Sequence, residues 1–147
     1  MSDMPATPNI TAITLGVRDV AASTVFYTEG LGFTLINSID GEIVFVQAGP
    51  GLMLALWNVR SMPAEYGDVA HGPAAPPISL GHNVSEATQV HRLYDRALAA
   101  GAVPVSAPEE RPWGGTSACV ADPDGFRWDF VHNPAFSVAA DGTVSCV

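Results

Sequence analysis

The residues most able to do chemistry lie in one short segment near the end of the sequence. Asp129 and Arg127 are two residues apart in a run that alternates charged and aromatic side chains. A strand there would place both charges on one face. The carboxylate could bind a cation or act as a general base, or the two charges could pair with each other or with water. We expect Asp129 to be the catalytic group if the protein has one.

Hydroxyl and aromatic side chains supply further candidate ligand contacts. Thr14 and Ser79 occupy corresponding positions in two similar segments, and each is either a ligand contact or a small residue within a sheet. Trp113 precedes two glycines in a loop, which core packing explains poorly, so we expect it to stack on a ligand at the mouth of the site. Phe45 and Trp57 are expected to face either the cavity or the core.

Other kinds of catalytic site have no local signature. The sequence contains neither of the glycine-rich phosphate-binding loops, and nothing indicates a Ser-His-Asp triad. Cys119 lies in a predicted strand without a neighbouring basic group, so we interpret it as a core cysteine rather than a nucleophile.

The composition restricts the partners. The 147 residues carry a net charge of −9, which argues against nucleic acid and anionic membranes and favours a cationic or neutral ligand. Acidity can also serve solubility alone. No apolar run approaches the roughly 18 residues of a membrane helix. The two cysteines, and a Met1–Pro5 segment without a basic and then apolar stretch, indicate a cytoplasmic protein.

The elements that must position these residues occur twice. Residues 13–17 (ITLGV) resemble residues 78–82 (ISLGH), at an offset of 78 − 13 = 65. Residues 54–58 (LALWN) match residues 129–133 (DFVHN), at an offset of 129 − 54 = 75. Strand-like alternation and helix-like periodicity follow in the same order in each copy. The sequence therefore predicts a duplicated supersecondary unit with a site between its copies.

The predicted fold is α+β, with two β-α-β-β-β modules in a single domain. The modules span residues 10–58 and 78–133, a linker rich in Pro, Gly and Ala spans 59–77, and a tail spans 134–147. Asp19 and Ser85 are the expected N-caps of the two helices.

Three segments carry a family resemblance. Residues 16–19 (GVRD), 26–33 (FYTEGLGF) and 122–129 (DPDGFRWD) resemble those of the vicinal oxygen chelate superfamily. That group includes glyoxalase I, extradiol dioxygenases, fosfomycin-resistance enzymes and bleomycin-binding resistance proteins. The resemblance covers roughly residues 10–134. It implies a curved mixed sheet that forms a cup, with helices on its convex side and Ile13, Leu15, Ile78 and Leu80 facing the helices.

The resemblance also implies where a metal would bind. Metal-dependent members hold their ion at four cup-facing positions, which correspond here to Ala12, Leu54, Pro77 and Asp129. Only Asp129 is a metal ligand, and one carboxylate cannot hold a catalytic divalent ion. We therefore expect no metal and no other cofactor.

The histidines leave an alternative open. They lie in the linker, off the apolar helix stripe or out of phase with Asp129. A displaced metal site is therefore the less favoured expectation. These histidines are His71, His82, His91 and His132.

Two functions remain open. The first is a metal-independent protein that sequesters a cationic or amphipathic small molecule, as the bleomycin-binding relatives do, and that forms a homodimer. The second is a glyoxalase-related isomerase or lyase, or a dioxygenase-like enzyme, with a displaced metal site or with Asp129 as its acid–base group. The sequence does not decide whether the modules pair within one chain or across a dimer.

Overall fold

The predicted α+β fold is confirmed by the computed structural model, which describes residues 6–70 and 72–146. The Met1–Pro5 segment and His71 lie outside the described residues. The first module contains β1 (Ala12–Val17), α1 (Val20–Val25), a π-helical turn η1 (Phe26–Gly30), β2 (Thr34–Ile39), β3 (Ile43–Gly49) and β4 (Leu52–Asn58). The linker holds a 3₁₀ turn η2 (Val59–Ser61) and a short helix α2 (Pro63–Tyr66).

The second module repeats the arrangement. It contains β5 (Ser79–Asn83), α3 (Ala87–Ala99), β6 (Val103–Glu110), β7 (Thr116–Ala121) and β8 (Arg127–His132). The tail forms a hairpin of β9 (Phe136–Val138) and β10 (Val144–Cys146), and Asp141 and Gly142 lie in the turn between these two strands. No helix among the described residues is long and apolar enough to cross a membrane.

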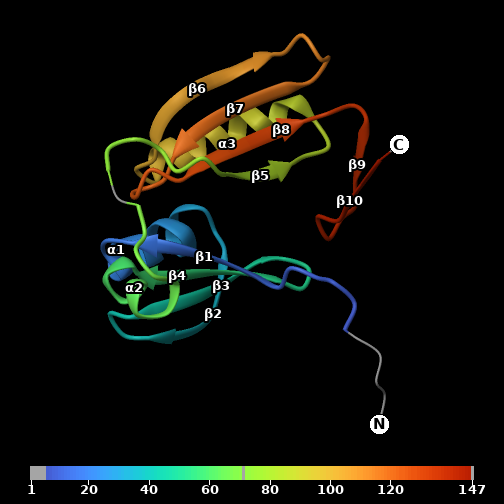
Figure 1. The fold of residues 1–147 in the computed structure, drawn as a ribbon. Coiled ribbons are helices and arrows are strands. Elements are labelled where there is room, and N and C mark those ends of the chain that lie inside the picture. The colour runs from blue at the N-terminus through green and yellow to red at the C-terminus, as the bar shows by residue number, and fades with distance from the viewer. Residues whose placement is uncertain (1–5, 71, 147) are drawn as a thin grey trace.

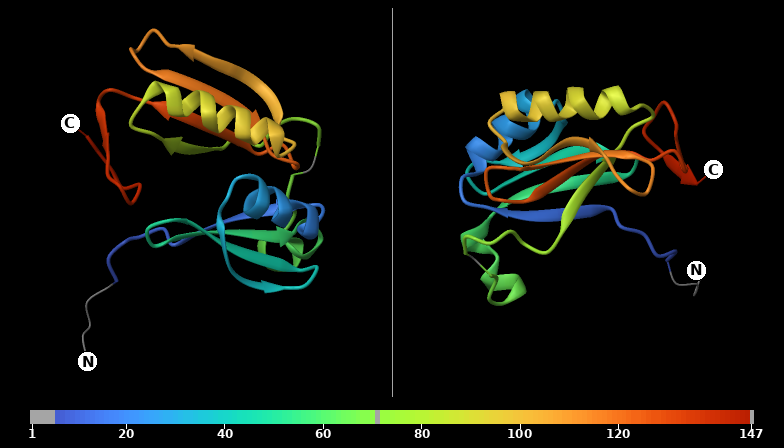
Figure 2. Two further views of the ribbon diagram at one scale, coloured as in Figure 1. Left: turned by 180° about the vertical axis from the view of Figure 1, so that it is seen from behind. Right: turned by 90° about the horizontal axis from the view of Figure 1, so that it is seen from above.

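Each module forms its own four-stranded sheet. The strand orders are β1-β4-β3-β2 and β5-β8-β7-β6, with the first and last strand of each module parallel and the other neighbours antiparallel. Figure 1 shows one sheet above the other, with β1 and β5 at the facing edges. Figure 2 shows that α1 and α3 cover the same side of the molecule, whereas α2 and the linker lie on the opposite side. Each sheet therefore has one face covered by α1 or α3 and an opposite face, which we call the open face. In the first module, α2 and the linker cover one end of the open face.

Strict alternation separates the two faces. Leu15 and Val17 of β1 and Trp128 and Phe130 of β8 point to the helix side, where each is at most 5% exposed. The buried side chains of both modules belong to one continuous hydrophobic cluster. Their sequence neighbours point to the open face, as period-2 geometry requires.

The caps confirm one prediction and correct another. The backbone N–H of Ala22 donates to Asp19 Oδ1 at 3.0 Å, so Asp19 is the N-cap of α1. Ser85 is not the N-cap of α3, because that position belongs to Glu86. The Gln89 side chain accepts the backbone N–H of Glu86 at 3.0 Å, and this capping box begins the helix one residue later than expected.

A buried hydrogen-bonded chain joins the modules. Tyr27, in η1, is fully buried, and its hydroxyl donates to Asp122 Oδ2 at 2.6 Å. Trp128 Nε1 donates to the same hydroxyl at 2.9 Å. The other Asp122 oxygen accepts the backbone N–H groups of Asp124 and Phe126, which closes the turn before β8. Burial raises the pKa of Asp122, and the hydrogen bonds from Tyr27 and the backbone oppose that rise. Each module thus supplies part of one polar network.

Removal of the Tyr27 hydroxyl tests this connection. We expect Tyr27→Phe to lower the free energy of unfolding by about 1–3 kcal/mol, because Asp122 Oδ2 and the Trp128 N–H lose a buried partner. Urea denaturation measures the change, and Tyr66→Phe serves as the control because the Tyr66 side chain is exposed. Equal stability of the two variants would show that the network does not hold the modules together.

Candidate functional site

The strand register places the charged candidates on the open face of the second module. Arg127 lies opposite Ser79 of β5, and Asp129 lies opposite Gly81 of the same strand. Their neighbour Trp128 points to the core, as the alternation predicts. Ser79, Arg127 and Asp129 therefore share one surface, in two adjacent rows across the sheet.

Cys119 belongs to the same surface, so its interpretation as a core cysteine is wrong. Ala118 and Val120 on either side of it are buried, which turns Cys119 to the open face opposite Asp129. Burial raises the pKa of the Cys119 thiol, and the negative charge of Asp129 raises it further. The guanidinium of Arg127 partly opposes the rise. The thiol is therefore protonated at neutral pH.

A second polar cluster on this surface was not found from the sequence. Arg111 Nε donates to Ser117 Oγ at 2.8 Å and Arg111 Nη2 donates to Ser106 Oγ at 2.8 Å. Its Nη1 donates to Glu109 Oε1 at 2.6 Å. Ser106 pairs with Cys119 in the sheet, so this cluster continues the row that contains Asp129. Its residues are separated by a strand turn, and only the register brings them together.

The open face of the first module is mainly apolar. Thr14 lies opposite Ala55, which lies opposite Phe45, and Trp57 lies in the next row opposite Ile43. Thr14, Phe45 and Trp57 are therefore all on the open face.

The linker covers one end of this apolar surface. The indole N–H of Trp57 donates to Glu42 Oε1 at 2.7 Å. The Trp57 ring meets the Tyr66 ring of α2 edge to face, with centroids 5.3 Å apart. Both contacts fix the Trp57 ring on the open face.

Two residues expected on particular faces are placed differently. Leu54 does not face the site, because it pairs with Ile13 on the helix side and is 1% exposed. The cause is the offset between the last strands of the two modules. Leu15 and Leu80 are equivalent in the repeat, and they pair with Leu56 and Trp128, so β4 and β8 are related by an offset of 128 − 56 = 72. The offset of 75 expected from the sequence differs from 72 by an odd number and so exchanges the faces.

The corrected positions on β4 still offer no metal ligand. They are Met53, Ala55 and Trp57, on the face shared with Thr14. Ile78, expected to face the helices, precedes β5 and is 49% exposed.

The side chains around Asp129 do not fit a divalent ion. Within residues 6–70 and 72–146, no three His, Cys, Asp or Glu side chains gather where one ion could bind them all. His82 packs edge to face on Phe130, and His132 Nδ1 lies 3.3 Å from the Val84 carbonyl oxygen. Cys119 is the register partner of Asp129, and two donors do not make a catalytic metal site.

Trp113 lies at the tip of the β6–β7 hairpin and is 53% exposed. Its ring covers Gly115, where a Cβ atom would come within 2.0 Å of the ring. Gly114 has a positive φ of 98°, which the tight turn requires. Local packing and turn geometry therefore account for both glycines, and stacking on a ligand stays a prediction.

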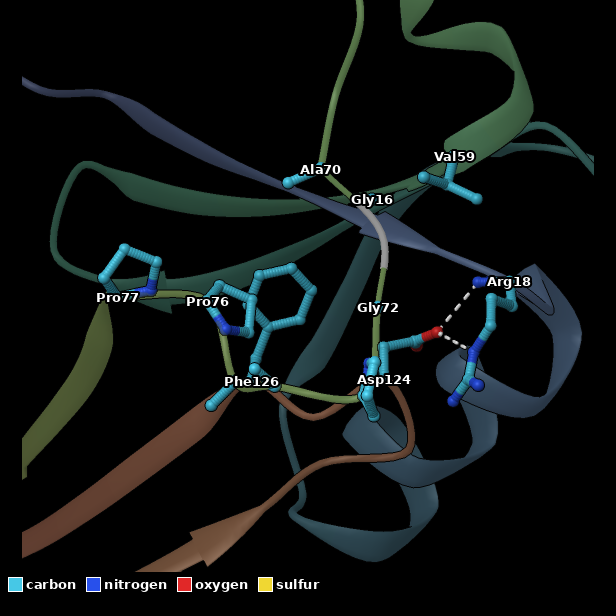
Figure 3. Close-up of a pocket in the computed structure, with 12 residues that line it drawn as sticks. Gly16, Arg18, Val59, Ala70, Gly72, Pro76, Pro77, Asp124 and Phe126 are labelled. Atoms are coloured by element: carbon cyan, nitrogen blue, oxygen red, sulfur yellow. Dashed lines mark hydrogen bonds and ion pairs between the residues drawn. The ribbon is translucent and has the colours of Figure 1, made fainter.

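Two cavities are present in the described part of the chain, and neither includes the predicted ligand contacts. One, of about 660 Å³, lies between the linker, β1 and the turn before β8. Figure 3 shows the Arg18–Asp124 ion pair on one side of it and Pro76, Pro77 and Phe126 on the other. The second, of about 260 Å³, lies between the β3–β4 turn, β5 and the C-terminal hairpin.

The comparisons with known proteins agree with this architecture. The sequence-family model of the Glyoxalase/Bleomycin resistance protein/Dioxygenase superfamily matches residues 9–130 of the chain. The chain is similar to a glyoxalase-related enzyme from Fulvimarina pelagi, at 37% identity and a TM-score of 0.84, over 95% of this chain and 98% of that one.

More distant structures share the fold. A glyoxalase/bleomycin resistance protein/dioxygenase from Nocardioides is 28% identical, with a TM-score of 0.73 over 88% of this chain and 86% of that one. A lactoylglutathione lyase from Agrobacterium tumefaciens is 21% identical, with a TM-score of 0.66 over 88% and 96%. No curated protein sequence matches the chain.

The contact between Cys119 and Asp129 can be tested by thiol titration. Asp129 raises the pKa of the thiol, so Asp129→Asn should lower it and speed alkylation near neutral pH. The measurement is the pH dependence of iodoacetamide alkylation in a Cys146→Ser background, which removes the exposed second thiol. Asp95→Asn, on the outer surface of α3, is the matched control. If the midpoint of the alkylation pH profile were unchanged in Asp129→Asn, the Asp129 carboxylate would not influence the Cys119 thiol.

Proposed function

Because the chain belongs to the Glyoxalase/Bleomycin resistance protein/Dioxygenase superfamily, we propose that its open faces form a ligand-binding cup. We further propose that the protein sequesters a small cationic or amphipathic molecule without a metal. The observation that carries this proposal is the donor chemistry around Asp129. The register surrounds this carboxylate with glycine, a thiol and an arginine, instead of the histidines and carboxylates that a divalent ion needs.

The contrast between the two open faces supports an amphipathic ligand. The first module offers Phe45, Met53 and Trp57, which suit an apolar or aromatic body. The second offers Arg127 and Asp129, which suit a polar or charged end. A molecule in contact with both faces would match each with its own chemistry.

A glyoxalase-related reaction is the second candidate. It is favoured by the 37% identity to a glyoxalase-related enzyme. In that case Asp129 would act as the acid–base group.

We propose that the protein is a cytoplasmic homodimer. The free thiols Cys119 and Cys146 suit a reducing compartment. The outer strand β2 has Leu35, Ile36 and Ile39 exposed by 45–62%, and an unpaired apolar edge strand favours association. A second copy would cover this edge and bring the open face of one module towards that of its partner.

The ligand proposal makes a joint prediction about metal and charge. Protein purified without chelators should contain far less than one equivalent of Zn, Ni, Fe or Mn by mass spectrometry. It should bind rhodamine 6G, an aromatic cation, as measured by tryptophan quenching. Asp129→Asn should weaken this binding about tenfold, because it removes the charge that faces the cation, and Asp95→Asn should not. A stoichiometric metal, or equal affinity of the two variants, would contradict the proposal.

The dimer proposal predicts that light scattering yields twice the 15.3 kDa chain mass. Ile39→Lys should yield the monomer mass, because a charge on the β2 edge opposes its burial. Ile10→Lys, at an exposed isoleucine outside the sheets, should leave the dimer intact. A wild-type monomer would exclude a cup shared between two chains.

A further inference from the structure

The repeat places two equivalent glycines on the open faces, and their surroundings differ. Gly16 of β1 and Gly81 of β5 are separated by the repeat offset, 81 − 16 = 65. At Gly16 a Cβ atom would lie 2.7 Å from the Sδ atom of Met62, so the linker fills that space. At Gly81 a Cβ atom would meet nothing within 4 Å. The space above Gly81, which we call the Gly81 notch, is open.

The Gly81 notch lies directly beside Asp129. The two residues are register partners of parallel strands, and Cys119 is the partner of Asp129 on its other side. Because Gly81 has no side chain and a Cβ atom there would meet nothing within 4 Å, one flank of the half-buried carboxylate is left open. A carboxylate with room beside it is better placed to bind a cation than one enclosed by side chains.

Arg127 occupies the adjacent row of the same face. It is half-buried, and its guanidinium donates to the Gly125 carbonyl oxygen at 3.0 Å, towards the turn and away from Asp129 along the strand. Among the described residues the ion pairs are Arg18–Asp124 and Arg111–Glu109, so Arg127 and Asp129 do not pair with each other. Two opposite charges thus lie roughly 7 Å apart along the strand, each able to accept a partner.

A ligand with a single charge would pair with only one of Arg127 and Asp129. The other half-buried charge would then face the uncharged body of the ligand without a partner, which costs binding free energy. We infer that the cup selects an amino-acid-like zwitterion with an apolar body, an inference that rests on the proposed function. The ammonium of the ligand occupies the Gly81 notch against Asp129, and its acid group binds Arg127. Its apolar body lies on the open face of the first module. The net charge of −9 disfavours anions in general, so a carboxylate would be recruited by Arg127 locally.

Three probes with one aromatic body test the inference. L-phenylalanine carries both charges, phenethylamine only the cation and 3-phenylpropionate only the anion. Isothermal titration calorimetry should show phenylalanine binding about tenfold more tightly than either analogue. Arg127→Gln should remove the higher affinity of phenylalanine relative to phenethylamine. Asp129→Asn should remove its higher affinity relative to 3-phenylpropionate.

The notch itself is tested by a glycine pair. Gly81→Ala should weaken phenylalanine and phenethylamine about tenfold with little change in stability, because the added methyl group meets only open space. Gly49→Ala is the matched control, since Gly49 also has open space and also borders the 260 Å³ cavity behind β5. If Gly81→Ala and Gly49→Ala lost equal affinity for phenylalanine, the ligand would lie in that cavity, and its assignment to the Gly81 notch would be wrong.

The remaining outcomes also decide the inference. If phenethylamine binds as tightly as phenylalanine, or if none of the three probes binds, the zwitterion assignment is wrong. Binding of rhodamine 6G through Asp129 would in either case leave the proposed function intact, whereas a stoichiometric metal would overturn the proposed function itself.

Discussion

The position of the whole site depends on the buried contact between Tyr27 and Asp122. The two residues are 95 positions apart, and their hydrogen bond crosses from one module to the other. Asp122 also closes the turn that begins β8, so the same carboxylate fixes where Arg127 and Asp129 start along the strand. A buried carboxylate is costly unless it is fully hydrogen-bonded. Its three donors therefore restrict the modules to arrangements that satisfy all of them at once.

The second constraint is the alternation of faces along each strand. One face of strands β1, β4, β7 and β8 enters the common core, so a side chain on their other face points away from it whatever its chemistry. This rule turns Cys119 to the open face although cysteine is most often buried. It also turns Leu54 into the core, where no ligand reaches it. Whether a residue faces the candidate site thus depends on its odd or even position along the strand (its parity) rather than on its residue type.

Parity also explains how far the sequence could predict the structure. The Asp19 cap, the turn at Asp122 and the face of Asp129 depend on local patterns, and the sequence was sufficient for them. The register of β7 against β8 and of β1 against β4 is set by the turns and the core together. Local patterns therefore could not place Cys119 beside Asp129, nor correct the odd offset that misplaced Leu54.

Duplication explains why one site carries two kinds of surface. Both modules need the same apolar helix-side positions to share a core, so those positions are alike in the two copies, as Leu15 and Leu80 show. The open faces have no such requirement and have diverged. In the first module Met62 fills the space at Gly16, whereas in the second the space at Gly81 is empty and a carboxylate lies beside it. A fold built from two equal halves thereby acquires an apolar wall and a charged wall, and the proposed ligand, in contact with both, would be bound in one orientation.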